Sequence, residues 1–344
     1  MEYLIIDGAQ GEGGGQVLRS ALTLSMLTQT PIEIKNIRAN RQKPGLMRQH
    51  LTSVMAAQQI CDAILDGAEL GSTGIRFAPN QVKAGNYHFA IGSAGSTVLV
   101  CQTILLALGM ADGQSKVSFE GGTHNGMSPS LCFFTEAFLP LLKRAGIACK
   151  VEVTSLGFYP AGGGKWQIHI EPTSQVNKLD LFDGEILHSD IEANSALKAI
   201  VSGLQSKIGE REILAARKSL SWGTAKAVVE QVKTPGPGNS FQIHVNAKTH
   251  TNVFEVTGEV GVSAENIGKR CAGRVKKWQQ SGAIVEEHLA DQLLLLMAAA
   301  GGGRFTTTAP SAHTLTNIDV IRHITGLSIT VQPQSDTLWI VSLE

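Results

Sequence analysis

The chain has 344 residues, 43% of them hydrophobic and 17% charged, and its 29 lysines and arginines balance its 29 aspartates and glutamates. This composition is typical of a folded protein with one large or two unequal domains, and it excludes a disordered chain. Because the net charge is zero, any contact with a polyanion must be local. The five cysteines are scattered without a CxxC pair, which argues against a disulfide framework or a zinc site.

The sequence shows no membrane or export signal. The longest apolar run, residues 293–300, is too short to cross a bilayer, and the first ten residues lack the basic region and apolar core of a signal peptide. We therefore expect a cytoplasmic protein without a membrane partner. None of the patterns below fixes an oligomeric state.

Hydrophobic periodicity predicts a βαβαββ unit of roughly 80 residues that occurs twice in the first half of the chain. In the first copy, Pro44 suits a first helical turn. The first copy has strands or helices at residues 3–6, 15–27, 32–37 and 44–60, followed by two short strands. The second copy has them at residues 87–91, 97–108, 116–120, 130–144, 149–153 and 165–170.

A third copy of the unit is interrupted. Its opening strand is expected at 179–183, and its later elements follow at 285–300, 304–307, 318–324, 328–331 and 338–343. The intervening stretch has strands of its own at 241–245 and 253–256 and a charged helix at 264–280. The sequence thus predicts an α/β fold in which three βαβαββ repeats form a core, residues 1–184 plus 281–344. A smaller α/β domain, residues 185–280, is inserted in the third repeat.

A glycine-rich segment, DGAQGEGGGQVLRS at residues 7–20, lies between a predicted strand and helix. Exposed backbone N–H groups there could face an anion, although a turn that only allows close packing explains the glycines equally well. The segment does not match GxGxxG, because residue 16 is glutamine, and no P-loop sequence occurs in the chain. Glu12 slightly favours the functional interpretation, since a carboxylate among exposed glycines can hold Mg²⁺ beside a phosphate.

Basic residues are concentrated between positions 38 and 50 and comprise Arg38, Arg41, Lys43, Arg48 and His50. Guanidinium groups bind phosphate oxygens in pairs and can position a nucleic-acid strand without reading its bases. A solvated charged loop remains an equal alternative on charge alone.

Two histidines lie in further polar segments. The helix that begins VEEHLADQ brings His288, Asp291 and Gln292 onto one face, where they could hydrogen-bond a base or ribose, although an ordinary polar first turn is the simpler interpretation. Two ligands without a third argue against a metal site there. His313 lies in APSAHTLTN, a polar loop before a predicted helix, where a neutral imidazole would be accessible and nucleophilic.

Together these segments resemble the RNA 3′-terminal phosphate cyclase family over essentially the whole chain. The matching motifs are DGAQGEGGGQ, RxxRxKPGLxRQHL at 38–51, GSAGS before the second-repeat helix, GFYPAGGG at 157–164, EHLADQL at 287–293 and PSAHxLTN at 310–317. The family's fold, three βαβαββ units with a small inserted domain, agrees with the repeats found above. Two features depart from the family, and the first is that Leu156 and Trp166 flank the glycine signature in place of a basic and an aliphatic residue. His288 stands where the family commonly has tyrosine.

The resemblance implies an ATP-dependent ligase that converts an RNA 3′-phosphate into a 2′,3′-cyclic phosphate through an adenylated His313 and an RNA(3′)pp(5′)A intermediate, releasing AMP and diphosphate. It implies Mg²⁺ or Mn²⁺ as cofactor, with Glu12 beside the metal and the phosphates. The implied nucleotide pocket comprises Glu12, Gln102, His288, Leu289, Ala290, Asp291 and Gln292. The residues implied to contact the RNA phosphates are Arg19, Arg38, Arg41, Gln49 and His50.

Two other functions remain as alternatives. Relatives of the cyclases that lack the histidine act as non-catalytic RNA-binding proteins in ribosomal-RNA processing, and enolpyruvyl transferases use a similar repeated unit on small molecules. The intact PSAHxLTN motif argues against the first. The basic cluster at 38–50 argues against the second.

Overall fold

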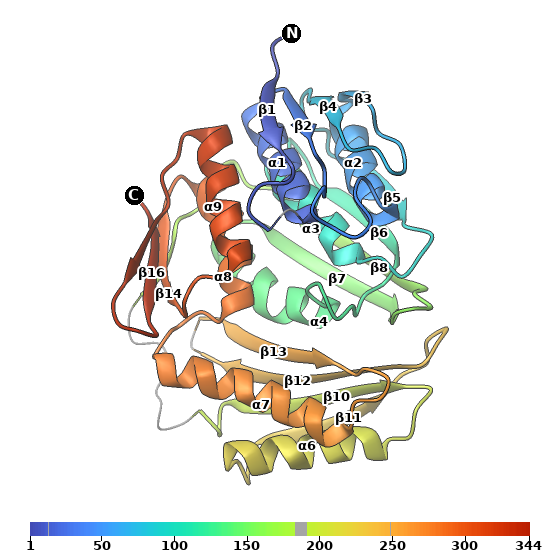
Figure 1. Cartoon of the computed structure of the whole chain (residues 1–344), viewed down its shortest axis with the longest axis vertical. Helices are drawn as coiled ribbons and strands as arrows, with labels where there is room; N and C mark the ends of the chain where they lie inside the picture. The colour runs from blue at the N-terminus through green and yellow to red at the C-terminus, as the bar shows by residue number, and fades with distance from the viewer. Residues whose placement is uncertain (13, 183–190, 248) are drawn as a thin grey trace.

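The computed structural model describes residues 1–12, 14–182, 191–247 and 249–344 of the chain (Figure 1). The described residues form four four-stranded sheets covered by helices. The predicted α/β class is therefore confirmed. No helix in these ranges is both long enough and apolar enough to span a bilayer.

The first sheet is formed near the N-terminus. Its strands are β1 (Leu4–Asp7), β2 (Ile32–Lys35), β3 (Ile64–Asp66) and β4 (Ile75–Ala78), and its helices are α1 (Gly15–Thr28) and α2 (Arg48–Cys61). β1 and β2 are parallel, β4 and β3 are antiparallel to their neighbours, and the order is β1-β2-β4-β3. The helix expected from residue 44 begins only at Arg48. Gly45 has a φ of +76° and donates its N–H to the Ile37 carbonyl, so the chain around Pro44 is an irregular loop.

The second sheet repeats this order as β5-β6-β8-β7. Its elements are β5 (Asn86–Ala90), α3 (Thr97–Gly109), β6 (Ser115–Gly121), α4 (Leu131–Phe133), the π-helix η1 (Phe134–Phe138), α5 (Leu139–Arg144), β7 (Ala148–Ser155) and β8 (Gly164–Glu171). The single helix predicted at 130–144 is thus divided. Pro140 lacks an N–H and cannot donate to the carbonyl of Glu136, which accounts for the irregular turn just before it.

The third sheet has the order β15-β16-β14-β9. Read from β9, its strands follow one another as first, second, fourth and third in the chain, which is the order in the other two sheets. Its elements are β9 (Leu179–Leu181), α8 (Glu287–Ala300), β14 (Gly303–Thr307), α9 (Ala312–Thr325), β15 (Thr330–Pro333) and β16 (Trp339–Leu343). β9 pairs in parallel with β14 across the long intervening segment. Helices from different sheets pack together, since α1 contacts both α3 and α9, and the helices share one hydrophobic core.

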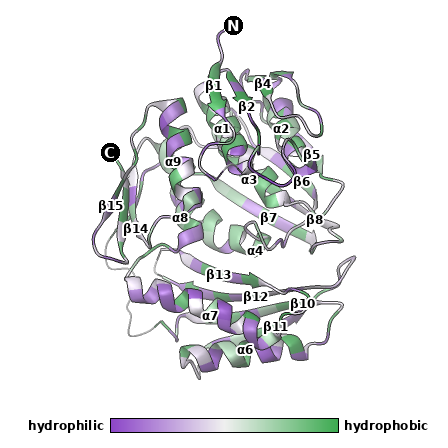
Figure 2. Ribbon diagram, viewed as in Figure 1, coloured by the Kyte–Doolittle hydropathy of each residue, from purple (hydrophilic) through white to green (hydrophobic). Residues whose placement is uncertain are grey.

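The intervening segment forms the fourth sheet, with the order β11-β10-β12-β13. Its elements are β10 (Ser195–Ser202), α6 (Lys207–Leu220), β11 (Lys226–Gln231), β12 (Gly238–Asn246), β13 (Thr251–Thr257) and α7 (Ala264–Ser281). Figure 2 shows hydrophilic and hydrophobic residues mixed along α6 and α7. On α7 the buried Ile267, Cys271, Val275 and Trp278 recur every three or four residues, as in an amphipathic helix.

This segment has a hydrophobic cluster of its own, separate from the main core, which includes Leu197, Phe241 and Trp278. We propose on this ground that it is a distinct domain. The expected boundary between residues 184 and 185 lies outside the described residues. The expected boundary between 280 and 281 falls at the last residue of α7.

Candidate active site

The sequence pattern indicated that His313 lies in a loop before the helix, but the structure places it in the first turn of α9. The reason is a helix cap: the Ser311 side chain accepts a hydrogen bond from the N–H of Thr314 at 3.1 Å and starts the helix at Ala312. The side chain of His313 is 52% exposed, so a dissolved substrate can reach the ring. The helix fixes the backbone of this residue.

The Nδ1 atom of His313 faces two acceptor oxygens. It lies 2.8 Å from Gln16 Oε1 and 2.7 Å from Glu12 Oε2. Both oxygens can only accept a hydrogen bond, so a neutral imidazole here carries its proton on Nδ1. The lone pair is then on Nε2, which is the nitrogen able to act as a nucleophile.

Gln16 connects this histidine to a second carboxyl group. Its Nε2 donates to Asp291 Oδ1 at 2.7 Å, while its Oε1 faces His313. Desolvation raises the pKa of Asp291, against the effects of the Gln16 hydrogen bond and the nearby positive groups. The amide of Asn317 donates to the Asp291 carbonyl at 3.4 Å and its Oδ1 accepts from Ser20 at 2.7 Å, so α1, α8 and α9 are held together at the site.

Glu12 is held from two sides as well. Its N–H donates to Thr316 Oγ1 at 3.2 Å, and its Oε1 lies 3.0 Å from Arg41 Nη2. The other oxygen, Oε2, is buried and makes no hydrogen bond of good geometry, although His313 Nδ1 is 2.7 Å away. This oxygen therefore keeps the capacity to accept a further positive group.

The described residues contain no group of three potential metal ligands. A divalent ion at Glu12 would therefore take one oxygen from the protein and the rest from substrate phosphates and water. Mg²⁺ is commonly bound in this way, by one or two carboxylates and substrate phosphates. The Glu12 carboxylate, whose Oε2 has no hydrogen bond of good geometry, is the protein oxygen that such an ion would use.

Basic side chains surround the N-terminus of α1. A Cβ atom at Gly15 would lie 2.4 Å from His50 Nε2 and 2.8 Å from Arg19 Nη1, so glycine is required for these groups to approach the backbone. Burial, together with the charges of Arg19 and Arg38, lowers the pKa of His50 to about 3, so its ring is neutral at physiological pH. Burial also lowers the pKa of Arg19, to about 10, and leaves it charged.

Residues expected to contact RNA also have partners within the protein. Arg38 donates to the carbonyls of Lys43 at 2.7 Å and Gly45 at 2.8 Å, and so holds the basic loop in shape. Gln49 accepts a hydrogen bond from the N–H of Ser96 at 2.6 Å, which connects α2 to the GSAGS loop. Arg41 forms an ion pair with Glu12, whose other carboxylate oxygen lies against His313.

The stretch 288–292 divides into two faces of α8. His288 is exposed, whereas Leu289 and Ala290 are buried in the main core. Gln292 accepts a hydrogen bond from Gln102 of α3, so these two predicted pocket residues are in contact. The helix begins after Glu286, whose buried carboxylate accepts from the N–H groups of His288 and Leu289.

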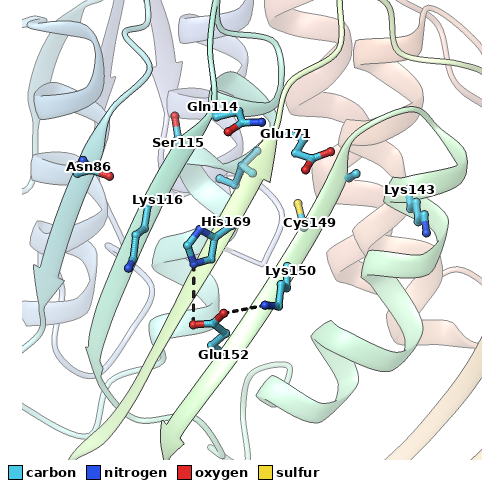
Figure 3. A pocket seen from close by; sticks show the side chains of 12 residues that line it. Asn86, Gln114, Ser115, Lys116, Lys143, Cys149, Lys150, Glu152, His169 and Glu171 are labelled. Carbon is cyan, nitrogen blue, oxygen red and sulfur yellow. Dashed lines mark ion pairs between the residues drawn. The ribbon is translucent and has the colours of Figure 1, made fainter.

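A separate hollow of about 580 Å³ lies on the outer face of the second sheet (Figure 3). It contains none of the predicted site residues. Lys150 lies 2.9 Å from Glu152, and His169 lies 3.9 Å from the same carboxylate. Lys150 and His169 thus lie beside the same carboxylate, and we assign the hollow no part in the site around His313.

One departure from the family motif, Trp166, has a structural explanation. Trp166 is buried, stacks on Phe119 with ring centroids 4.6 Å apart, and donates its N–H to Thr97 Oγ1 at 2.8 Å. It therefore fills the core behind the glycine signature. Sequence reasoning missed Gln16, which had been considered only as a mismatch to GxGxxG, and it missed Thr316 and Asn317. All three residues lie within the motifs shared with the family, DGAQGEGGGQ and PSAHxLTN, and this could have identified them.

The site combines an accessible imidazole, a carboxylate and a cluster of basic groups, an arrangement that suits an enzyme acting on phosphate groups. The sequence profile for RNA 3′-terminal phosphate cyclase matches residues 10–331. A protein of that name from Koribacter versatilis is 43% identical over 338 residues, covering 98% of this chain and 94% of its own length. One from Salmonella typhimurium is 46% identical over 319 residues, covering 92% of each chain. The chain belongs to the RNA 3′-terminal phosphate cyclase family.

Proposed function

We propose that this chain is an ATP-dependent ligase that converts the 3′-phosphate of an RNA into a 2′,3′-cyclic phosphate. One observation carries the proposal: both acceptors at His313 face Nδ1, which leaves the lone pair on Nε2 of an accessible ring. The catalytic function is favoured over that of a cyclase-like binding protein because the nucleophile and the groups that orient it are present together.

The reaction has three steps. Nε2 of His313 attacks the α-phosphorus of ATP, a P–N bond forms, the bond to the bridging oxygen breaks and diphosphate leaves. An oxygen of the RNA 3′-phosphate then attacks the same phosphorus and breaks the P–N bond, giving RNA(3′)pp(5′)A. Finally the neighbouring 2′-hydroxyl attacks the 3′-phosphorus, loses its proton and expels AMP. Adenylation is needed because a phosphate monoester has no good leaving group.

Residues around the nucleophile orient it and bind the nucleotide. Gln16, held by Asp291, fixes the ring plane and tautomer of His313 before the attack. We assign the adenine and ribose contacts to Gln102, His288, Asp291 and Gln292. The side chains of Leu289 and Ala290 are buried and their N–H groups donate to Glu286, so these two residues would support the pocket from the core side.

The RNA phosphate is assigned to Arg19, Arg38, Arg41, Gln49 and His50. His50 accepts the N–H of Met47 on Nδ1 at 3.3 Å, so its neutral ring carries the proton on Nε2, beside Gly15. This N–H can donate to a phosphate oxygen. Arg19, at the same glycine, supplies positive charge.

Glu12 is assigned as the protein ligand of Mg²⁺ or Mn²⁺, because its Oε2 lacks a hydrogen bond of good geometry. When bound, the ion offsets the negative charge of the triphosphate as diphosphate leaves. Arg41 holds the other oxygen of the carboxylate in place.

The test is to incubate the protein with ATP and an RNA that ends in a 3′-phosphate. We expect an RNA end that resists phosphatase, together with release of AMP and diphosphate, and no reaction when the RNA ends in a 3′-hydroxyl. RNA binding without any change in the 3′-phosphate would instead support the binding-protein alternative.

A further inference from the structure

The exposed ring of Tyr159 is the feature that the proposed function leaves unexplained. Tyr159 lies in the GFYPAGGG segment and is 74% exposed, whereas its neighbour Phe158 is 2% exposed. Phe158 packs on His124, with ring centroids 5.0 Å apart, and so accounts for the aromatic character of the segment on its inner side. No ring contact of this kind involves Tyr159 among the described residues.

The loop that carries Tyr159 is firmly held. Gly157 donates its N–H to Thr123 Oγ1 at 2.9 Å, and Gly162 donates to the Phe158 carbonyl at 2.7 Å. A Cβ atom at Gly162 would lie 2.9 Å from Ala94 Cα, and one at Gly163 would lie 2.5 Å from Pro235 Cγ. The loop is therefore fixed between the GSAGS loop and the inserted segment, and its aromatic ring stands on a rigid base.

A continuous set of contacts leads from His313 to this loop. His50 approaches Gly15 in the glycine segment that also holds Gln16. The next residues of the path are on the same turn of α2: Arg48 donates to the Gly92 carbonyl at 3.0 Å, and Gln49 accepts from Ser96. The GSAGS loop, residues 92–96, then contacts Gly162 of the Tyr159 loop through Ala94.

The outer side of this path suits an extended nucleic-acid strand. Arg48, Gly92, Ser93 and Tyr159 are all exposed, and small residues between the charged and aromatic side chains allow a backbone to lie close. Lys233, also exposed, precedes the turn whose Pro235 contacts the Tyr159 loop. Proteins bind single strands by combining basic side chains with exposed aromatic rings, and both kinds of group occur here.

We propose that Tyr159 stacks on an unpaired base of the RNA, upstream of the nucleotide whose 3′-phosphate lies near His313, and that Arg48 and the GSAGS loop support the strand between them. The inference rests on the proposed function, since it takes the RNA end to lie at the His313 site. It adds a binding position for a second part of the strand. A rigid ring loses little freedom on stacking, so the contact favours binding without reading sequence.

The experiment measures cyclisation against RNA concentration for Tyr159→Ala and Tyr159→Phe. With an oligonucleotide long enough to reach the loop, Tyr159→Ala should raise the RNA concentration for half-maximal rate by about 5- to 150-fold, whereas Tyr159→Phe should resemble the original protein. Self-adenylation with ATP alone should be unchanged in both. Leu214→Ala, which alters a 70% exposed side chain on α6, is the matched control and should change nothing.

Abasic nucleotides identify the position. A single abasic substitution at one upstream site should weaken binding of the original protein as much as Tyr159→Ala does, and combining the two should add no further loss. Equal half-maximal RNA concentrations for Tyr159→Ala and the original protein would overturn the inference. It would also be overturned if Tyr159→Ala raised the half-maximal concentration of a dinucleotide substrate as much as that of the long oligonucleotide. If the original protein neither adenylates itself nor cyclises RNA, the proposed function fails instead, and fluorescence anisotropy of the labelled oligonucleotide still reports the Tyr159 contact.

Discussion

Replacing Gln16 with methionine tests how His313 is oriented. Methionine keeps most of the side-chain volume but removes the acceptor at His313 Nδ1 and the donor at Asp291 Oδ1, which lie 2.8 Å and 2.7 Å from Gln16. The negative charge of Glu12 Oε2, 2.7 Å from Nδ1, remains, so orientation is weakened and not abolished. Losing one neutral and one charged hydrogen bond should raise the barrier by about 1–3 kcal/mol, or slow adenylation about 5- to 150-fold.

The assay is single-turnover formation of enzyme–AMP from ATP labelled at the α-phosphate, at saturating ATP. Gln280→Met, the same substitution at an exposed site on α7, is the control and should adenylate at the original rate. An unchanged rate for Gln16→Met would refute the view that this amide fixes the imidazole tautomer. A loss of folding free energy as large as the rise in the activation barrier would indicate that Gln16 acts through packing.

Three further changes separate the other roles. Arg41→Ala should reduce AMP transfer to RNA by about 10- to 150-fold, as expected for the loss of a charged hydrogen bond. Adenylation should fall only slightly, because the ion pair between Arg41 and Glu12 is about one third exposed and such pairs contribute about 0–1 kcal/mol. A parallel fall in both steps would place Arg41 with the nucleotide. His288→Ala should raise the ATP concentration for half-maximal adenylation and keep the rate at saturation, and superimposable ATP titrations would remove His288 from the pocket. Burial raises the pKa of Glu212 to about 7 from 4.5. The folded state therefore retains a proton that the unfolded chain loses, and stability should fall by about 3 kcal/mol as pH rises from about 4.5 to 7. Denaturant titrations across that range should show a flatter pH profile for Glu212→Gln, and identical profiles would contradict the assigned pKa.

Much of the fold could be predicted from local pattern. Strands such as β6 and β8 alternate buried and exposed residues, and the amphipathic helix α7 has caps and periodicity that are visible in the sequence. β11 was missed because it is an edge strand exposed along nearly its whole length, so it has no alternation to detect. The predicted start of α9, at residue 318, was too late because Ser311 was not recognised as the residue that caps the helix.

The site was less predictable because its contacts join distant parts of the chain. Motif resemblance pointed to Glu12 and His313, yet nothing local indicates that Gln16 contacts a histidine 297 positions away. The ion pair between Arg41 and Glu12 likewise crosses from a basic loop to a glycine loop. Such pairs depend on how the repeats pack against one another, which periodicity does not encode.

The most direct test of the central claim is to locate the AMP group on the protein. After incubation with α-labelled ATP and a divalent metal, the label should survive base, be released by acid, and map by peptide sequencing to His313. His313→Ala should fold normally and take up no label. Label on any other residue, or normal labelling of His313→Ala, would contradict the assignment of His313 as the nucleophile.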